Sequence, residues 1–202
     1  MRHKRKGRRL GRSSSHRRSL FRNLATALLL TERDESFYEG LLMPNGKPVN
    51  APTYKGRIIT TIQKAKEVKP LVERLITLAK KALPHQAAAE KLNTNAERNT
   101  EAWKKWRDSD QWQQWNAAIS PAVNARRQAF AILRDKEAVE LLFDVVAPRF
   151  VDRTGGYTRV MRLAVPRLGD NGTRAILEFV GNHDRVTQTS QAPSFASDDS
   201  DE

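Results

Sequence analysis

The stretch RIITTIQKAKEVKPLVERLITLAKKAL, residues 57–83, changes its hydrophobic pattern part-way along and thereby decides the fold class. Residues 57–62 form a short run rich in β-branched side chains, which predicts a strand. From residue 63 to residue 83 apolar side chains recur every three or four positions, which predicts an amphipathic helix. Pro70 lies inside this helix and should kink it or mark a new helix start. A strand followed directly by a helix indicates a chain of mixed α and β structure.

The segment that follows, residues 84–120, is polar and contains all four tryptophans of the chain. Asp108-Ser109-Asp110 is typical of a cap between two short helices. The first of these helices would carry Trp103 and Trp106, and the second would carry Trp112 and Trp115. Further along, Ser120 and Pro121 predict the N-cap and first turn of another helix, and Asp135 can cap the next one.

The remaining elements complete the expected fold. The serine run at 13–15 supplies candidate N-caps for a helix, and residues 16–28 have the spacing of an amphipathic helix. Residues 157–166 and 174–180 alternate as strands do. The sequence GDNG at 169–172 predicts the turn of a hairpin between these two strands. We therefore expect an α+β fold, with helices packed on a small three-stranded mixed sheet, in the order helix, strand, helices, β-hairpin.

The positive charge of the chain is concentrated at its N-terminal end. The 202 residues carry a net charge of +13, from 36 Lys/Arg and 23 Asp/Glu. Residues 1–22 hold ten of the bases and no acid, so the other 180 residues hold 26 bases against 23 acids, a net of +3. Residues 1–12 are too charged to fold alone, and we expect them to form an extended basic arm. This distribution is typical of a polyanion-binding arm joined to a nearly balanced domain.

The composition of the arm favours RNA as the polyanion. The first 18 residues contain seven arginines but two lysines, and His3 and His16 add stacking or donor capacity. A guanidinium group pairs bidentately with phosphate and stacks on unpaired bases, which a simple solubility role does not need. A solvated basic tail or a nuclear-localisation tract is the alternative interpretation. Composition alone does not separate RNA from DNA.

Other locations and function classes receive little support from the sequence. The chain has no cysteine, which suits a reducing cytoplasm and excludes disulfides and thiolate metal sites. No apolar run approaches the roughly 20 residues that a membrane helix needs, and no apolar segment follows the basic start as in a secretory signal. We therefore expect a cytoplasmic protein without a membrane partner.

Catalytic constellations are not evident. The four histidines lie in dissimilar contexts without metal-ligand spacing, and there is no phosphate-binding loop of the nucleotide-hydrolase type. Ser14, Ser15 and His16 fit capping and phosphate contacts better than a nucleophile system. Glu32, Asp34 and Glu35 could suggest magnesium ligands, although a solvated acidic turn is the simpler interpretation. We expect no enzyme activity, no cofactor and no small-molecule substrate. A nucleoid-type DNA-binding protein and an RNA-processing enzyme that uses these carboxylates are the rival hypotheses.

Four long blocks resemble one known family. They are MRHKRKGRRLGRSSSHRRSLFRNLATAL (1–28), RIITTIQKAKEVKPLVERLITLAK (57–80), RRQAFAILRD (126–135) and PRFVDRTGGYTRV (148–160). In this order they are similar to the bacterial large-subunit ribosomal protein number seventeen family. The resemblance implies an α+β fold with a mixed sheet, binding to large-subunit (23S) rRNA, neighbouring large-subunit ribosomal proteins as partners, and a structural role without catalysis.

The resemblance also implies two sets of RNA-binding residues. The first set comes from the arm and the start of the first helix: Arg2, His3, Lys4, Arg5, Lys6, Arg8, Arg9, Arg12, Ser15, His16, Arg17, Arg18 and Arg22. The second set is Arg153, Gly155, Gly156, Tyr157, Thr158 and Arg159. In this second set, glycines let backbone amides approach a phosphate, while the tyrosine and the arginines offer stacking and charge. Without the resemblance, a flexible turn before a strand would be the simpler interpretation of these residues.

We expect three parts along the chain: the RNA-binding arm at 1–12, a single α+β domain at 13–186, and a disordered acidic tail at 187–202. The segments at about 34–54 and 84–120 depart from the family pattern and are interpreted as insertions. The tryptophans of the second segment could anchor a partner or form a small satellite core. The tail is expected to be a solvated end, although it could also mask the basic arm before assembly.

Overall fold

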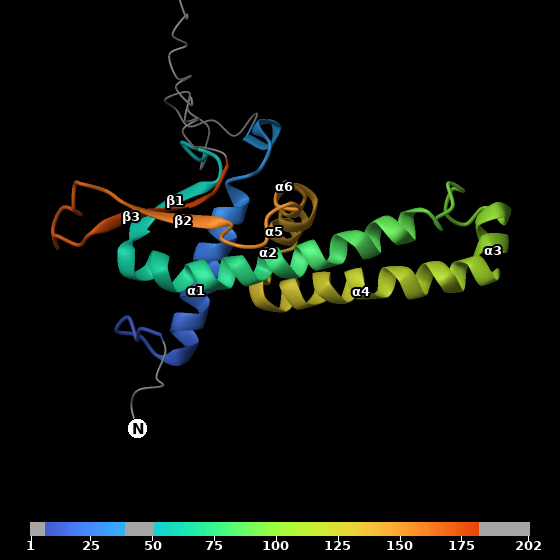
Figure 1. The fold of residues 1–202 in the computed structure, drawn as a ribbon, viewed down its shortest axis with the longest axis horizontal. Coiled ribbons are helices and arrows are strands. Elements are labelled where there is room, and N and C mark those ends of the chain that lie inside the picture. Colours follow the sequence, from blue (N-terminus) through green and yellow to red (C-terminus); the bar gives the residue numbers. More distant parts are fainter. Residues whose placement is uncertain (1–6, 39–50, 182–202) are drawn as a thin grey trace, which may run out of the picture.

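A computed structural model describes residues 7–38 and 51–181 of the chain (Figure 1). The elements confirm the predicted α+β class. In chain order they are α1 (Ser14–Leu30), the 3-10 turn η1 (Glu35–Tyr38), β1 (Arg57–Thr61), α2 (Ile62–Glu90), α3 (Glu101–Arg107), α4 (Asp110–Leu133), α5 (Lys136–Leu141), the π-helical turn η2 (Leu142–Val146), α6 (Ala147–Arg149), β2 (Thr158–Arg162) and β3 (Arg174–Phe179). The first half of the predicted arm, most of the predicted loop at 34–54 and the predicted acidic tail lie outside the described residues.

The three strands form one sheet in the order β1-β3-β2, and both pairs are antiparallel. The expectation of a mixed sheet was therefore wrong. β2 and β3 pair as the predicted hairpin, and β3 then lies between β2 and β1. Because β3 runs antiparallel to both neighbours, β1 and β2 run parallel to each other, but β3 separates them and they do not pair. The register sets Arg57 and Arg159 on either side of Glu178.

Two long helices replace several shorter predicted ones. α2 continues through Pro70 and Pro84, and α4 continues through Pro121, where we expected a new helix to begin. A proline inside a helix removes one backbone hydrogen bond and costs roughly 3 kcal/mol. All three prolines lie at exposed positions, so water can solvate the carbonyl groups that lose a partner. The packing of α2 against α4 then compensates for the lost hydrogen bonds.

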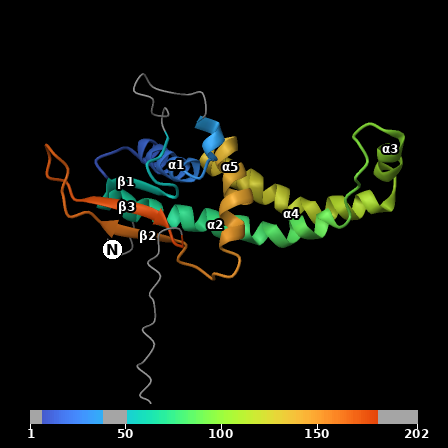
Figure 2. The same cartoon turned by 90° about the horizontal axis from the view of Figure 1, so that it is seen from above.

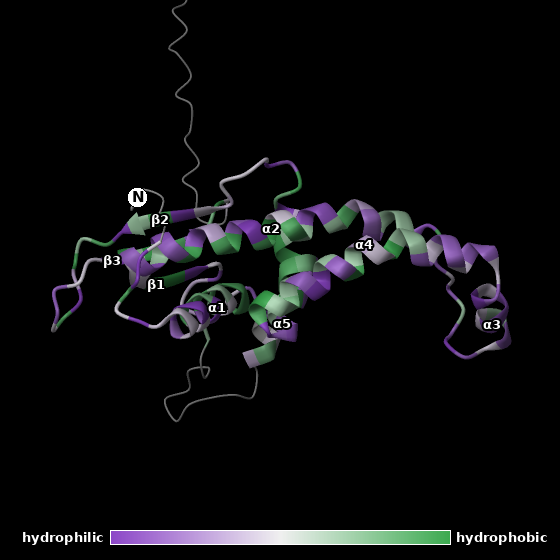
Figure 3. Ribbon diagram, turned by 90° about the horizontal axis from the view of Figure 1, so that it is seen from below, coloured by the Kyte–Doolittle hydropathy of each residue, from purple (hydrophilic) through white to green (hydrophobic). Residues whose placement is uncertain are grey.

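α2 and α4 form an antiparallel helical hairpin that extends well beyond the sheet, with α3 at its far end (Figures 1 and 2). The far half of this hairpin is the polar segment at 84–120. In Figure 3 its end is mostly hydrophilic, whereas hydrophobic colour gathers where α1, α5 and α2 meet. α3 itself buries no residue. The hairpin end therefore adds little to the hydrophobic core of the domain.

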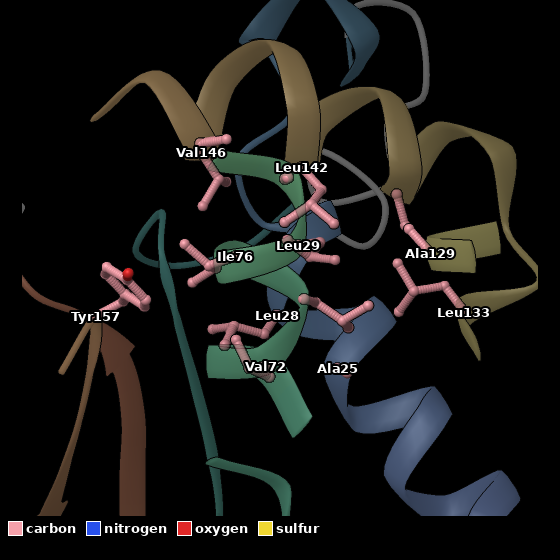
Figure 4. Packing of buried hydrophobic residues seen from close by; sticks show 14 of the residues in the cluster. Ala25, Leu28, Leu29, Val72, Ile76, Ala129, Leu133, Leu142, Val146 and Tyr157 are labelled. Atoms are coloured by element: carbon pink, nitrogen blue, oxygen red, sulfur yellow. The ribbon is translucent and has the colours of Figure 1, made fainter. Parts of the chain in front are cut away.

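The core lies where α1 and the helical run α5–η2–α6 meet α2, close to the inner face of the sheet (Figure 4). Leu28 and Leu29 of α1 and Ile76 of α2 are fully buried there. The sheet contributes Leu177 and Phe179 from β3. This core fixes the C-terminal half of α1, since the first buried residue of that helix is Ala25. The N-terminal half of α1 therefore projects from the domain and carries the arm (Figure 1).

Candidate nucleic-acid interface

A tight turn joins the arm to α1. The backbone N–H of Arg12 donates to the carbonyl of Arg9 at 3.2 Å, and Leu10 and Gly11 both have positive φ angles. Ser13 then caps α1, because its hydroxyl accepts from the backbone N–H of His16 at 3.4 Å. A helix capped in this way begins at a fixed point, as the serine run predicted. The turn and the cap together hold the side chains at 8–18 at the projecting end of α1.

The cations at this end have few carboxylate partners. No acidic residue occurs in the sequence before Glu32. Among the described residues of the arm and α1, only Arg8 forms an ion pair with a carboxylate, that of Glu67, at 3.6 Å. Arg9 and Arg18 are exposed, and Arg17 is half-buried. The predicted residues Ser15 and His16 are exposed beside them. This end of the molecule therefore carries uncompensated positive charge facing solvent.

Two of the predicted arginines make contacts that shape the protein. Arg12 donates from Nη1 to the carbonyl of Leu10 at 2.8 Å and so closes the turn before α1. Arg22 donates from Nε to the carbonyl of Ile132 at 2.8 Å, near the C-terminal end of α4. A cation at this position also interacts favourably with the helix dipole. Arg22 thus ties α1 to α4.

The second predicted set divides into an exposed loop and a buried strand start. Arg153, Gly155 and Gly156 are exposed, and Arg153 donates from Nε to the carbonyl of Gly155 at 3.0 Å. Lys80 of α2 donates to the carbonyl of Arg153. Gly156 has a φ of +64°, and no heavy atom lies within 4 Å of the position of an added Cβ at either glycine. The loop is therefore held in shape while its backbone stays open to a ligand.

Tyr157 and Thr158 do not fit the predicted contact with RNA. The ring of Tyr157 is only 2% exposed and lies 5.3 Å from the ring of Phe150. The hydroxyl of Thr158, also buried, donates to Oε1 of Glu73 at 3.0 Å. The loop runs from solvent into the edge of the sheet at this point, so the strand start belongs to the core. A base cannot stack on Tyr157 in this structure.

Arg159 belongs to an ion-pair cluster on the outer face of the sheet. Its Nε and Nη2 lie 2.9 Å and 2.6 Å from Oε1 of Glu178, whose side chain is completely buried. Arg57 of β1 reaches Oε2 of the same carboxylate at 3.0 Å. One carboxylate thus links all three strands. We did not predict Glu178 from the sequence, although an acidic residue inside an apolar strand is a signal for such a pair.

The carboxylate that motivated the magnesium hypothesis has another function. Glu32 is buried and accepts two hydrogen bonds from Arg149, at 3.0 Å and 2.9 Å. Hydrogen bonding by Glu32 raises the pKa of the Arg149 guanidinium, against the opposing effect of desolvation. Within residues 7–38 and 51–181 there is no group of three or more His, Cys, Asp or Glu that could hold a metal ion. The ion pair holds the turn that follows α1 against α6.

Comparison with known proteins identifies the family. The sequence profile described as Ribosomal protein L17 matches residues 49–180. The chain belongs to the ribosomal protein L17 family. Among proteins of this name, the large ribosomal subunit protein bL17 of Rhodopirellula baltica is 59% identical over 198 residues, which cover 98% of this chain and 90% of the relative. The bL17 of Thermomicrobium roseum is 34% identical and that of Allorhizobium ampelinum 33%, each over 89% of this chain and over 99% and 82% of the relative.

Membership of the L17 family confirms the resemblance that the four blocks indicated. The chain is a structural constituent of the bacterial large ribosomal subunit. The alignment with the Rhodopirellula baltica bL17 covers so much of the chain that it includes most of the basic arm and the segments at 34–54 and 84–120. None of the described helices is both long and apolar enough to cross a membrane.

Proposed function

We propose that this L17 chain binds 23S rRNA through the arm and the projecting end of α1, with the loop at 153–156 as a second contact. The observation that carries the proposal is the uncompensated charge of this end. Most arginines near the core pair with carboxylates, as Arg149 pairs with Glu32 and Arg159 with Glu178. Arg9, Arg17 and Arg18 instead have no carboxylate partner among the described residues.

RNA phosphate would supply the missing negative charge. Each Lys or Arg that neutralises a phosphate releases condensed counterions, so binding through such contacts weakens steeply with salt. Residues 1–12 contain seven Lys/Arg, and α1 adds Arg17 and Arg18. A short cation-rich segment inserted between RNA helices reduces their mutual repulsion. In this way the arm would stabilise the folded rRNA while the domain stays at its surface.

The loop at 153–156 offers a smaller contact of a different kind. Arg153 would supply charge, and the open backbone at Gly155 and Gly156 would let amide groups approach a phosphate. Tyr157, Thr158 and Arg159 would act through the fold, because their contacts with Phe150, Glu73 and Glu178 hold the loop in place. The second set therefore divides into contact residues and positioning residues.

We also propose that neighbouring large-subunit proteins contact the far end of the α2–α4 hairpin. Residues 90–115 carry five bases and five acids, so this end lacks the excess charge of the arm. The guanidinium of Arg107 lies over Trp103 and Trp112, with 5.2 Å and 5.9 Å to the ring centroids. Half-exposed tryptophan and arginine on a neutral surface are typical of protein-binding hot spots. The rings of Trp106 and Trp115 pack edge-to-face with their centroids 5.6 Å apart, as a small satellite core.

A deletion tests the main proposal. The chain that begins at Ser13 should bind 23S rRNA transcripts far more weakly than the full chain, and the dependence of its affinity on salt should be much shallower. Its thermal unfolding should stay nearly unchanged, because the core begins at Ala25. A variant with Lys104→Gln and Lys105→Gln controls for lost charge in general. Equal affinity and equal salt dependence of the deleted and full chains would overturn the proposal. Competition by duplex DNA at equal strength would favour the nucleoid-type rival.

A further inference from the structure

A hollow of about 470 Å³ lies at the base of the β2–β3 hairpin, at the opposite end of the sheet from the loop at 153–156. The hairpin projects beyond the start of α2 (Figure 1). The hollow is lined by one exposed apolar residue, two threonines and three cations from β1, α2 and the hairpin. These residues are Ile59, Thr60, Thr61, Lys64, Arg167 and Arg174.

The charge of this hollow is not balanced by the protein. Among the described residues, no carboxylate forms an ion pair with Lys64 or Arg174. Arg167 does have a partner, since it donates to both carboxylate oxygens of Asp170 across the hairpin turn. This contact raises the pKa of Arg167 and lowers that of Asp170. Asp170 therefore orients one of the three cations, and the other two remain uncompensated.

The tip of the same hairpin exposes apolar side chains that the fold does not use. Leu168 is fully exposed, at 101%, and Val165 is 69% exposed. The segment from the end of β2 to the start of β3 thus combines apolar side chains with Arg162, Arg167 and Arg174. A single exposed leucine needs no explanation, but a fully exposed one at the end of a projecting basic hairpin suits a contact with a partner.

We infer that the hollow binds a phosphate group of rRNA, with Leu168 placed against an adjacent nucleotide. The inference rests on the proposed rRNA binding but concerns a contact separate from the arm. Lys64 and Arg174 would neutralise the phosphate, and the hydroxyl group of Thr61, which lies opposite Arg174 in the sheet register, would donate a hydrogen bond to it. Apolar side chains inserted beside basic ones are a recurring way to contact the sugars and bases next to a neutralised phosphate. RNA fits this mixture better than an acidic protein segment, which would leave Leu168 without a regular partner.

Paired substitutions in the full chain test the inference. Lys64→Gln with Arg174→Gln removes two cations without touching the core, and Arg98→Gln with Lys105→Gln removes the same two charges at the far end of the α2–α4 hairpin. Affinity for 23S rRNA transcripts is measured across salt concentrations. Each lost phosphate contact reduces the slope of log affinity against log salt by about 0.7–0.9. Because both cations would neutralise the same phosphate, we expect the first pair to reduce the slope by about 0.7–0.9 and the control pair to leave it unchanged.

Footprinting of the RNA backbone then locates the contact. The Lys64/Arg174 pair and Leu168→Ser should lose protection at the same few nucleotides, and these should differ from the nucleotides exposed when residues 1–12 are deleted. A slope and footprint equal to those of the control pair would overturn the inference while leaving the arm proposal intact. Binding of the full chain that does not depend on salt would overturn both. A cross-link from position 168 to a neighbouring protein in place of rRNA would show that the hairpin serves a protein contact.

Discussion

The substitution Glu178→Gln should destabilise the fold more than any other single loss of an acid. The side chain of Glu178 is 0% exposed, yet its carboxylate lies within 3.0 Å of guanidinium groups from both Arg57 and Arg159. Glutamine keeps the shape and one hydrogen-bond acceptor but removes the negative charge. Two arginines on adjacent strands would then face each other without compensation.

The expected loss follows from the burial of the three groups. Removing one partner of a buried ion pair costs about 3–5 kcal/mol, because the remaining charge stays buried. Arg57 and Arg159 are 19% and 36% exposed, so water screens part of their charge and the cost falls to about 2–3 kcal/mol. Glu137→Gln is a matched control, since this carboxylate pairs with Arg33 but is 38% exposed. Exposed pairs contribute about 1 kcal/mol or less.

Urea unfolding followed by circular dichroism measures both losses. The free energy of unfolding of Glu178→Gln should fall by about 2–3 kcal/mol, and that of Glu137→Gln by less than about 1 kcal/mol. Replacing Arg159 by Gln in the Glu178→Gln background should then recover part of the loss, because one uncompensated charge disappears. If the two single variants lost equal stability, or if the second substitution caused a full further loss, the assignment of Glu178 as the link between the strands would be wrong.

Three further predictions concern the caps, the core and the hairpin. Asp135→Ala should lower the free energy of unfolding by about 1 kcal/mol, because its carboxylate accepts from the N–H of Ala138 at 2.8 Å; Asp135→Asn should restore most of it in urea unfolding. Tyr157→Phe should leave rRNA affinity unchanged, since the side chain is buried; a tenfold loss in a filter-binding assay would show instead that the hydroxyl group contacts the RNA. Arg167 lowers the pKa of Asp170, so the ion pair between them is fully formed above the ordinary pKa of 3.8 and is lost only as the pH falls well below that value. Arg167→Gln should therefore move the titration of the Asp170 carboxyl, followed by NMR, up towards 3.8.

The sequence predicted most elements because their signals are local. The serine run marked the start of α1, and Asp135 marked the start of α5. The turn at 169–172 and the two alternating segments around it gave the hairpin. Prolines misled the prediction at positions 84 and 121, because a proline lowers helix stability locally and the sequence does not reveal the packing that offsets this cost. Only the contact between α2 and α4 shows that both helices continue past these residues.

The candidate site was predicted less completely, since charge in the sequence does not reveal which cations already have partners. Arg159 and Arg18 look alike in the sequence, but the fold supplies a buried carboxylate to the first and none to the second. Tyr157 had the composition of a stacking residue, yet its place at the start of β2 directs it into the core. Lys64 and Arg174 lie 110 positions apart and were not predicted as a pair. Their proximity depends on the pairing of β1 with β3.

Cross-linking in assembled large subunits tests the central claim most directly. A photoreactive amino acid is placed at position 9 or at position 18, with position 105 on α3 as the control, and the cross-linked partner is identified. The uncompensated charge of the arm and α1 predicts that both positions cross-link to 23S rRNA. Cross-linking from position 105 should not depend on this charge. Subunits in which positions 9 and 18 react with solvent alone, or with protein and no rRNA, would contradict the account.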